Sequence, residues 1–125
     1  MRVKDAVGRF GEQTAARHLE AAGLTIIDRN WRAPRVAGSD VRGEIDLVAR
    51  EGDALVIVEV KTRSGTAFGT PAEAVTADKV RRVRRLAVAW LAAHPGERRA
   101  FVRFDVVSVV RAASGVTVEH LRGAF

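Results

Sequence analysis

Apolar or small residues recur at helical spacing over the first part of the chain: Val7, Phe10, Thr14, Ala15, Leu19 and Ala22. Because residues three and four apart share one face of a helix, this spacing predicts a helix from about Lys4 to Ala22. Gly23 stands where the C-terminal cap of that helix belongs. A short strand-like apolar run, Leu24 to Ile27, follows, and a polar stretch then extends from Asp28 to Arg32.

The middle of the chain predicts a β-hairpin. Glu44 to Arg50 and Ala54 to Arg63 are both rich in Val, Ile and Leu, and a Glu-Gly-Asp sequence at residues 51–53 separates them. The segment before the hairpin, Ala33 to Arg42, contains Pro, Gly, Ser and Asp, and we expect it to form a loop.

The second half of the chain predicts one helix and two further strands. Pro71 suits the first turn of a helix that runs to about Ala93, with an apolar stripe formed by Val80, Val83, Ala87 and Trp90. Phe101 to Val110 and Val116 to Leu121 are strand-like, and a turn separates them. The predicted order, α-β-β-β-α-β-β, describes an α/β fold with a mixed central sheet of about five strands flanked by helices.

Composition narrows the class of protein. At 125 residues, the chain is expected to form a single domain over residues 1–125. Its 21 Lys and Arg residues against 15 Asp and Glu residues give a net charge of +6, which by itself favours a polyanionic partner only weakly. The absence of Cys excludes disulfides, thiolate zinc sites and cysteine nucleophiles, and it fits a reducing cytoplasm.

The apolar segments of the chain do not predict membrane insertion or secretion. The longest apolar run, Leu86 to Ala93, is far shorter than the roughly 20 residues that a membrane span needs. Charged residues interrupt the N-terminal segment, which therefore lacks the apolar core of a secretory signal. We expect a soluble, cytoplasmic protein without a membrane partner.

The densest group of acidic residues in an apolar setting lies on the predicted hairpin. Strand side chains alternate between faces, so Glu44 and Asp46 share one face of the first strand, and Glu59 and Lys61 share one face of the second. If Gly52-Asp53 is a two-residue loop, Asp46 lies opposite Glu59 and Glu44 lies opposite Lys61. A three-residue loop would instead put Asp46 and Glu59 on different faces, unless a bulge intervened.

Two interpretations fit this acidic group. Opposed carboxylates repel each other unless a divalent cation lies between them, and Mg²⁺ held in this way can activate water for attack on a phosphodiester. Lys61 can then position or deprotonate the water, or neutralise the phosphate. The alternative is a solvated sheet face with Glu44 and Lys61 as a cross-strand ion pair. Apolar residues on both faces of the second strand indicate a central strand, which favours a site at the rim of a buried sheet.

Two motifs, Gly43-Glu-Ile-Asp-Leu-Val48 and Val58-Glu-Val-Lys-Thr-Arg63, resemble those of the small bacterial YraN-like family. That uncharacterised family belongs to the restriction-endonuclease-like, PD-(D/E)XK nuclease superfamily and is similar to the archaeal Holliday-junction resolvases. The resemblance extends over most of the chain and includes Gly8, Gly11, Glu12, Leu19, Gly23, Asn30, Phe68, Gly69, Lys79 and residues 103–105. The loop Ala33 to Arg42 is longer than the family usually has, which leaves the preferred substrate shape open.

The resemblance implies a restriction-endonuclease-like fold and a Mg²⁺- or Mn²⁺-dependent endonuclease that hydrolyses phosphodiester bonds in DNA, including branched or structured DNA. On this basis Asp46, Glu59 and Glu12 are metal-binding catalytic residues, and Lys61 is the catalytic lysine. Lys79 stands where related nucleases carry a polar residue on the helix after the Glu-x-Lys strand. The alternative is a non-catalytic nucleic-acid-binding or assembly module that retains the nuclease fold.

The expected DNA-binding residues are Arg63, Lys79 and Arg82. Arg63 and the segment Ser64 to Thr70 adjoin the predicted site, whereas the arginines at positions 81, 82, 84 and 85 either contact phosphates or form a solvated helix face. Resolvase-like relatives often act as dimers on two-fold junctions, so a homodimer is an expectation from the resemblance, although no dimer interface can be read from the sequence.

Other polar and aromatic residues are expected to be structural. Asp105 and Arg103 alternate on one face of a strand, and we expect them to form an ion pair. Trp31 and Trp90 are expected to pack in the core, and the alternative for Trp31, which arginines flank, is stacking on a nucleic-acid base. The three histidines have no ligand-like spacing, so a zinc site is not predicted.

Overall fold

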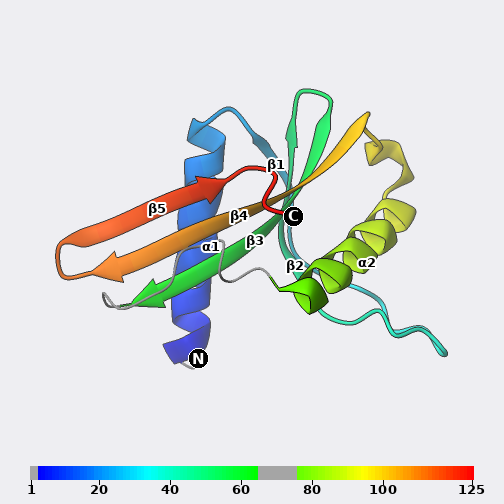
Figure 1. Ribbon diagram of the computed structural model, residues 1–125, viewed down its shortest axis with the longest axis horizontal. Coiled ribbons are helices and arrows are strands. Elements are labelled where there is room, and N and C mark those ends of the chain that lie inside the picture. The colour runs from blue at the N-terminus through cyan, green and yellow to red at the C-terminus, as the bar shows by residue number, and fades with distance from the viewer. Residues whose placement is uncertain (1–2, 65–75) are drawn as a thin grey trace.

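The computed structural model describes residues 3–64 and 76–125, and side chains from residue 6 onward within those ranges. Five strands form one sheet in the order β1-β2-β3-β4-β5, in which only β3 and β4 are parallel (Figure 1). The elements are α1 (Val3–Ala21), β1 (Thr25–Arg32), β2 (Glu44–Glu51), β3 (Ala54–Ser64), α2 (Ala77–Ala93), the 3₁₀ helix η2 (Pro95–Glu97), β4 (Phe101–Ala112) and β5 (Gly115–Leu121). The predicted α/β class and the order α-β-β-β-α-β-β are confirmed.

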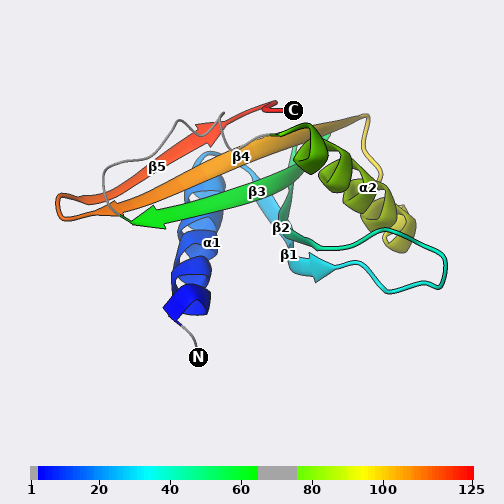
Figure 2. The ribbon, with the colours of Figure 1, turned by 60° about the horizontal axis from the view of Figure 1, so that its bottom comes forward.

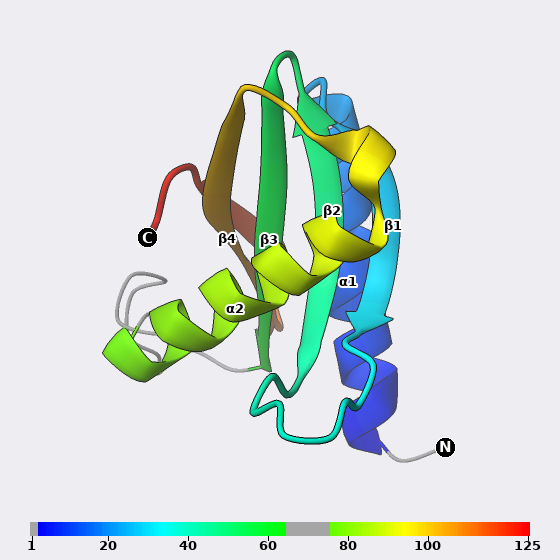
Figure 3. The same ribbon diagram turned by 90° about the vertical axis from the view of Figure 1, so that its right-hand side faces the viewer.

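The two helices cover opposite faces of the sheet. In Figure 3, α2 lies in front of β2 and β3, and α1 lies on the other side of the sheet, behind β2. On the α1 face, Leu19 is buried among side chains that include Val56 and Val58. On the α2 face, Leu86 and Trp90 are buried with a second set of side chains that includes Leu55 and Ile57. The strand β3 is therefore apolar on both faces and central, as its sequence predicts.

The first helix ends as its sequence predicts. Gly23 has a φ of 98°, a conformation that residues with side chains rarely adopt, and its N–H donates to the Glu20 carbonyl. The N–H of Leu24 donates to the Leu19 carbonyl at 3.0 Å. These two bonds form a Schellman motif, which satisfies carbonyls at the helix end and turns the chain into β1.

The first strand is longer than its apolar run suggests. The polar stretch that follows Ile27 is part of β1, and it pairs with β2 through Arg29↔Leu47 and Trp31↔Ile45. The expectation that the strand ends at Ile27 is therefore wrong. An edge strand is solvated along one side, so polar side chains are compatible with backbone pairing there.

The β2–β3 hairpin has the two-residue loop on which the site prediction depends. Glu51 pairs with Ala54, and the antiparallel register continues to Leu47↔Val58. Gly52 provides the positive φ of the turn, at 56°. The even register is thereby confirmed, and it brings the first residues of β2 to the same end of the sheet as the last residues of β3.

The second helix starts later than expected. Thr76 has extended backbone angles, and its hydroxyl accepts a hydrogen bond from the Lys79 N–H at 3.2 Å, so Thr76 is the N-cap and Ala77 begins the helix. The predicted start at Pro71 is therefore wrong, and Pro71 itself lies outside the described residues. Trp90 is buried, and its Nε1 donates to Asp28 of β1 at 2.8 Å.

The last two strands form a hairpin that extends beyond α1 on the side away from α2 (Figure 2). Asp105 of β4 is fully buried and accepts hydrogen bonds from Arg103 at 2.9 and 3.0 Å, which confirms the expected ion pair. His120 of β5 also contacts Asp105, at 2.7 Å. Across the described residues, no helix is long and apolar enough to cross a membrane.

Candidate metal centre

Three carboxylates meet at the end of the sheet where β2 begins. Glu12 of α1 and Glu44 and Asp46 of β2 each place one oxygen within 4.8 Å of the others. We call these residues the acidic trio. The structure thus brings together Glu12 and Asp46, two of the three predicted metal ligands, although they lie 34 positions apart in the sequence.

A local irregularity in β2 turns the side chains of Glu44 and Asp46 toward α1. Ile45 and Val48 both pack in the core beneath α2, although residues three apart lie on opposite faces of a regular strand. Pairing between β2 and β3 ends at Leu47↔Val58, and the Val60 N–H donates at 2.8 Å to the Asp46 side chain. Asp46 therefore lies where the two strands part, with its carboxylate held by the backbone of β3.

Close packing of α1 on β3 places Glu12. Gly11 is buried, and a Cβ atom added to it would lie 1.7 Å from the Thr62 hydroxyl oxygen, so only glycine fits here without movement. The Asn30 side chain of β1 makes a hydrogen bond to Glu12. Asn30 has a φ of 51°, a strained value for a residue with a side chain. Both contacts hold Glu12 over the start of β2.

The acidic trio has more negative charge than its surroundings neutralise. Burial raises the pKa of Asp46 to about 7, and the charges of Glu59, Glu12 and Glu44 add to this effect, against the hydrogen bond from Val60. Burial and the charge of Glu44 also raise the pKa of Glu12, while its hydrogen bond to Asn30 opposes the rise. Among the described residues, the ion pair recorded for the trio joins Glu44 to Arg32 at 3.1 Å.

This donor set fits Mg²⁺ or Mn²⁺. Carboxylate oxygens are hard ligands, and a divalent cation would relieve the repulsion that raises the pKa of Asp46. Glu44 was not predicted as a ligand. The sequence does indicate it, because Glu44 stands two residues before Asp46 and therefore shares its face of a strand. From the sequence, Glu44 was assigned only a cross-strand partner.

Glu59 lies beside the trio in a group of cations. Its Oε1 is 3.1 Å from the Lys79 Nζ, 3.7 Å from the Lys61 Nζ and 3.9 Å from Arg82. We call these four residues the Glu59 cluster. Burial and the neighbouring Lys79 lower the pKa of Lys61. Lys61 and Lys79 therefore share one carboxylate, and the Glu44–Lys61 ion pair of the alternative interpretation is replaced by the contact of Glu44 with Arg32.

The two groups are adjacent. The charge of Glu59 is the second largest cause of the raised pKa of Asp46, after burial, and the Val60 whose N–H holds Asp46 lies between Glu59 and Lys61 in the chain. Glu59 is outside the trio, so its role as a metal ligand stays a prediction. The arrangement places oxygen ligands for a cation next to a lysine with a lowered pKa.

The predicted DNA-binding residues lie around this site. Lys79 and Arg82 belong to the Glu59 cluster, and Arg63 is half-buried near the end of β3. The segment 65–70 lies outside the described residues. No role was predicted for Asn30 from the sequence. The one feature that could have pointed to it is that it belongs to the residues that carry the family resemblance.

Comparison with known proteins identifies the family. Residues 11–109 match the model of a family described as "Uncharacterised protein family UPF0102". The chain is 59% identical to a UPF0102 protein of Frankia alni, over 100% of this chain and 98% of the relative, and 56% identical to one of Frankia casuarinae, over 100% of both. A UPF0102 protein of Streptomyces coelicolor is 50% identical over 98% of this chain and 91% of the relative. The uncharacterised bacterial family expected from the motifs is thereby confirmed, and the chain belongs to UPF0102.

Proposed function

We propose that this protein is a Mg²⁺- or Mn²⁺-dependent endonuclease that hydrolyses phosphodiester bonds in DNA. The observation that carries the proposal is the acidic trio beside the Glu59 cluster: three carboxylates within 4.8 Å, next to two lysines that share one glutamate. Carboxylate-held divalent ions and a nearby lysine are a combination suited to water attack on a phosphodiester.

The residues divide into three roles. Glu12, Glu44 and Asp46 would hold the metal ion, which when bound lowers the pKa of water and stabilises charge on the phosphate. Lys61 holds a proton at its Nζ, and burial and the neighbouring Lys79 lower its pKa, which makes that proton easier to release. Glu59 orients Lys61 and Lys79 through its Oε1.

We further infer that the family belongs to the PD-(D/E)XK, restriction-endonuclease-like superfamily. Support comes from the Asp46 and Glu59-x-Lys61 pattern at the parting ends of β2 and β3, with Glu12 contributed by the first helix. This placement implies branched or structured DNA as substrate and a homodimer, and sedimentation of the purified protein tests the homodimer directly. The expected cytoplasmic location rests instead on the absence of Cys.

The proposal is tested by incubating the purified protein with Mg²⁺ or Mn²⁺ and a panel of duplex, single-stranded, flap and four-way DNA. The variants are Asp46→Asn, Glu44→Gln and Lys61→Ala. We expect cleavage by the parent and a loss of at least about 100-fold in each variant, because each removes a metal ligand or the general acid–base group. Asp53→Asn, an exposed acid in the β2–β3 turn, is the matched control and should cleave like the parent.

Metal binding and cleavage are measured separately in the same variants. Calorimetric titration with Mn²⁺ should show binding that Asp46→Asn and Glu44→Gln weaken and Lys61→Ala retains. Cleavage that persists in all three variants would identify a contaminating nuclease. DNA binding by the parent without cleavage in any metal would contradict the enzymatic proposal and favour the non-catalytic nucleic-acid-binding module.

A further inference from the structure

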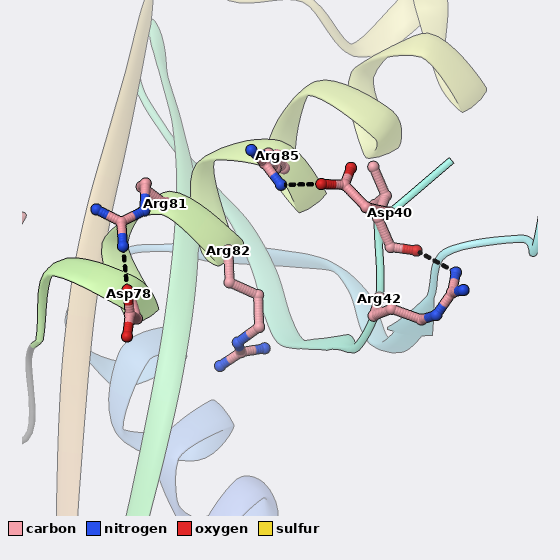
Figure 4. Close-up of a pocket in the computed structure, with 7 residues that line it drawn as sticks. Asp40, Arg42, Asp78, Arg81, Arg82 and Arg85 are labelled. Carbon is pink, nitrogen blue, oxygen red and sulfur yellow. Dashed lines mark hydrogen bonds and ion pairs between the residues drawn. The ribbon is translucent and has the colours of Figure 1, made fainter. Parts of the chain in front are cut away.

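A pocket of about 190 Å³ lies between α2 and the loop that leads into β2 (Figure 4). The residues that line it are Asp40, Val41 and Arg42 from the loop and Asp78, Arg81, Arg82 and Arg85 from α2. We call it the arginine pocket. From the sequence, most of these arginines were expected either to contact phosphates or to form a solvated helix face. Among the arginines that line the pocket, Arg82 is the one that belongs to the Glu59 cluster.

The arginine pocket has more positive than negative charge. It has four arginines and two aspartates, and each aspartate is already paired, Asp78 with Arg81 and Asp40 with Arg85. Arg42 donates to the backbone carbonyls of Ser39 and Val41, at 3.3 and 3.4 Å. The residues that line the pocket therefore carry two more positive than negative charges, which suits an anion with several acceptor oxygens.

The arginine pocket is adjacent to the metal site. Arg82 lines the pocket and also lies 3.9 Å from the Glu59 Oε1. In Figure 4 its side chain projects from α2 between Arg81 and Arg42. Gly43, with a φ of 106°, makes room for it, because a Cβ atom there would lie 3.0 Å from the Arg82 Nη1. Gly43 immediately precedes Glu44 of the acidic trio, so the pocket and the trio are built on adjoining residues.

We propose that the arginine pocket binds a backbone phosphate of the DNA strand that the metal site cleaves, a short distance along the strand from the scissile bond. The proposal rests on the proposed function for its class of substrate. Phosphates follow one another about every 3.4 Å of helix axis on each DNA strand, so a strand with one phosphate at the trio brings others to neighbouring surface. Guanidinium groups bind phosphate oxygens in pairs and fix the strand's position without reading its sequence.

The test measures equilibrium binding of a fluorescently labelled DNA duplex by anisotropy, in EDTA and over a series of salt concentrations. Arg42→Gln and Arg85→Gln should each weaken binding several-fold and reduce the slope of log affinity against log salt by about one. Arg84→Gln is the matched control, since it removes the same charge from α2 but lies by the Phe104 ring, outside the pocket lining. It should have the smaller effect on both quantities.

A change of opposite sign gives a second test. Asp40→Asn releases Arg85 from its ion pair and should tighten DNA binding. Asp53→Asn raises the net charge equally at the distant β2–β3 turn and should leave affinity close to that of the parent. Similar gains in both variants would show a general charge effect and would overturn the pocket.

The outcomes separate this proposal from the proposed function. Equal losses in Arg42→Gln, Arg85→Gln and Arg84→Gln, or no DNA binding by the parent, would overturn the pocket. If inorganic phosphate displaces the DNA from the parent but not from Arg42→Gln, the pocket proposal is supported. If phosphate binds in the pocket while the variants keep the DNA affinity of the parent, the pocket binds a small anion and the proposal is overturned. Pocket-dependent binding without any cleavage leaves the pocket standing and contradicts only the nuclease activity.

Discussion

Asp46 makes a structural hydrogen bond, and its negative charge is disfavoured by burial and by neighbouring carboxylates. It is held by the Val60 N–H at 2.8 Å, yet burial and three neighbouring glutamates raise its pKa to about 7. A carboxylate that gains protons this easily in the folded protein destabilises the fold when it is ionised. This cost is consistent with a site arranged for a cation rather than for the stability of the metal-free protein.

Asp46 therefore predicts the pH dependence of stability. Its pKa rises from 3.8 to about 7 on folding, so the folded state binds the extra proton between these values, and stability falls as pH rises through this window. The slope from this group is at most about 1.4 kcal/mol per pH unit. In thermal unfolding with EDTA, we expect Asp46→Asn to match the parent near pH 4 and to become increasingly more stable than the parent up to about pH 7.

The difference in melting temperature between Asp46→Asn and the parent reports on Asp46 together with the glutamates whose charges act on it, because the remaining titrations are common to both proteins. Asp53→Asn should show no such pH-dependent difference. Addition of Mg²⁺ at pH 8 should raise the melting temperature of the parent and leave that of Asp46→Asn nearly unchanged, since ligand binding to the folded state stabilises it. A difference that is the same at every pH would contradict the raised pKa.

At the scale of elements, the site depends on how closely α1 approaches β3. Gly11 contacts Thr62 with no room for a side chain, and Glu12 is the next residue on the helix. The glycine costs helix propensity, about 1 kcal/mol relative to alanine. Its retention inside the helix is explained by the packing distance, which decides whether Glu12 reaches Glu44 and Asp46.

We expect Gly11→Ala to destabilise the protein by about 1–3 kcal/mol in spite of the better helix propensity of alanine, because overpacking shifts α1 away from β3. The free energy of unfolding in urea measures this effect, and weaker Mn²⁺ binding should accompany it. Gly8→Ala is the matched control, since a Cβ at Gly8 meets no atom within 4 Å and the change should be neutral or stabilising.

Thr62→Ala in the Gly11→Ala background removes the hydroxyl that the new Cβ meets at 1.7 Å but leaves the Thr62 Cβ position at 2.8 Å. It should therefore recover part of the lost stability and part of the Mn²⁺ affinity, a non-additive result for two residues in contact. Equal stability of Gly11→Ala and the parent would show that the helix does not need this close approach.

At the scale of the whole molecule, one buried charge ties the far strands to the rest of the sheet. Asp105 accepts hydrogen bonds from Arg103 and from the Gly123 N–H at 2.9 Å, and contacts His120. Arg103 also pairs with Glu51, beside the β2–β3 turn, at 2.9 Å. This network lowers the pKa of Asp105, chiefly through Arg103 acting against the cost of burial. It joins β2, β4, β5 and the C-terminal residues.

Asp105→Ala should be the most destabilising of the substitutions considered, by about 3–5 kcal/mol, because it removes one partner of a buried ion pair and leaves others without an acceptor. Urea unfolding measures the loss. Asp53→Ala, which removes an exposed carboxylate, should change stability by less than about 0.5 kcal/mol. A small effect of Asp105→Ala would mean that water replaces the carboxylate and that the β4–β5 hairpin is held by its backbone pairing.

The sequence by itself determined the elements whose signals are local. Helical spacing and Gly23 predicted the end of α1. The turn at Gly52 predicted the β2–β3 hairpin but left two registers open, and the structure has the two-residue loop. The errors have local causes too. Polar residues of β1 concealed the second half of an edge strand, and Pro71 suggested an early start for a helix that Thr76 caps. The single domain over residues 1–125 stays a prediction.

Only the tertiary structure decided the composition of the candidate site. Asp46 and Glu59 were expected to face each other because side chains alternate along a strand. The irregularity near Ile45 instead turns Asp46 toward α1, where it meets Glu44 and Glu12, while Glu59 forms ion pairs with Lys61 and Lys79. The reason is physical: alternation in a strand is a local property, whereas the face that a residue reaches at a parting strand end depends on what packs against it. The sequence determined which residue types were present, and the packing of α1 and α2 decided which of them meet.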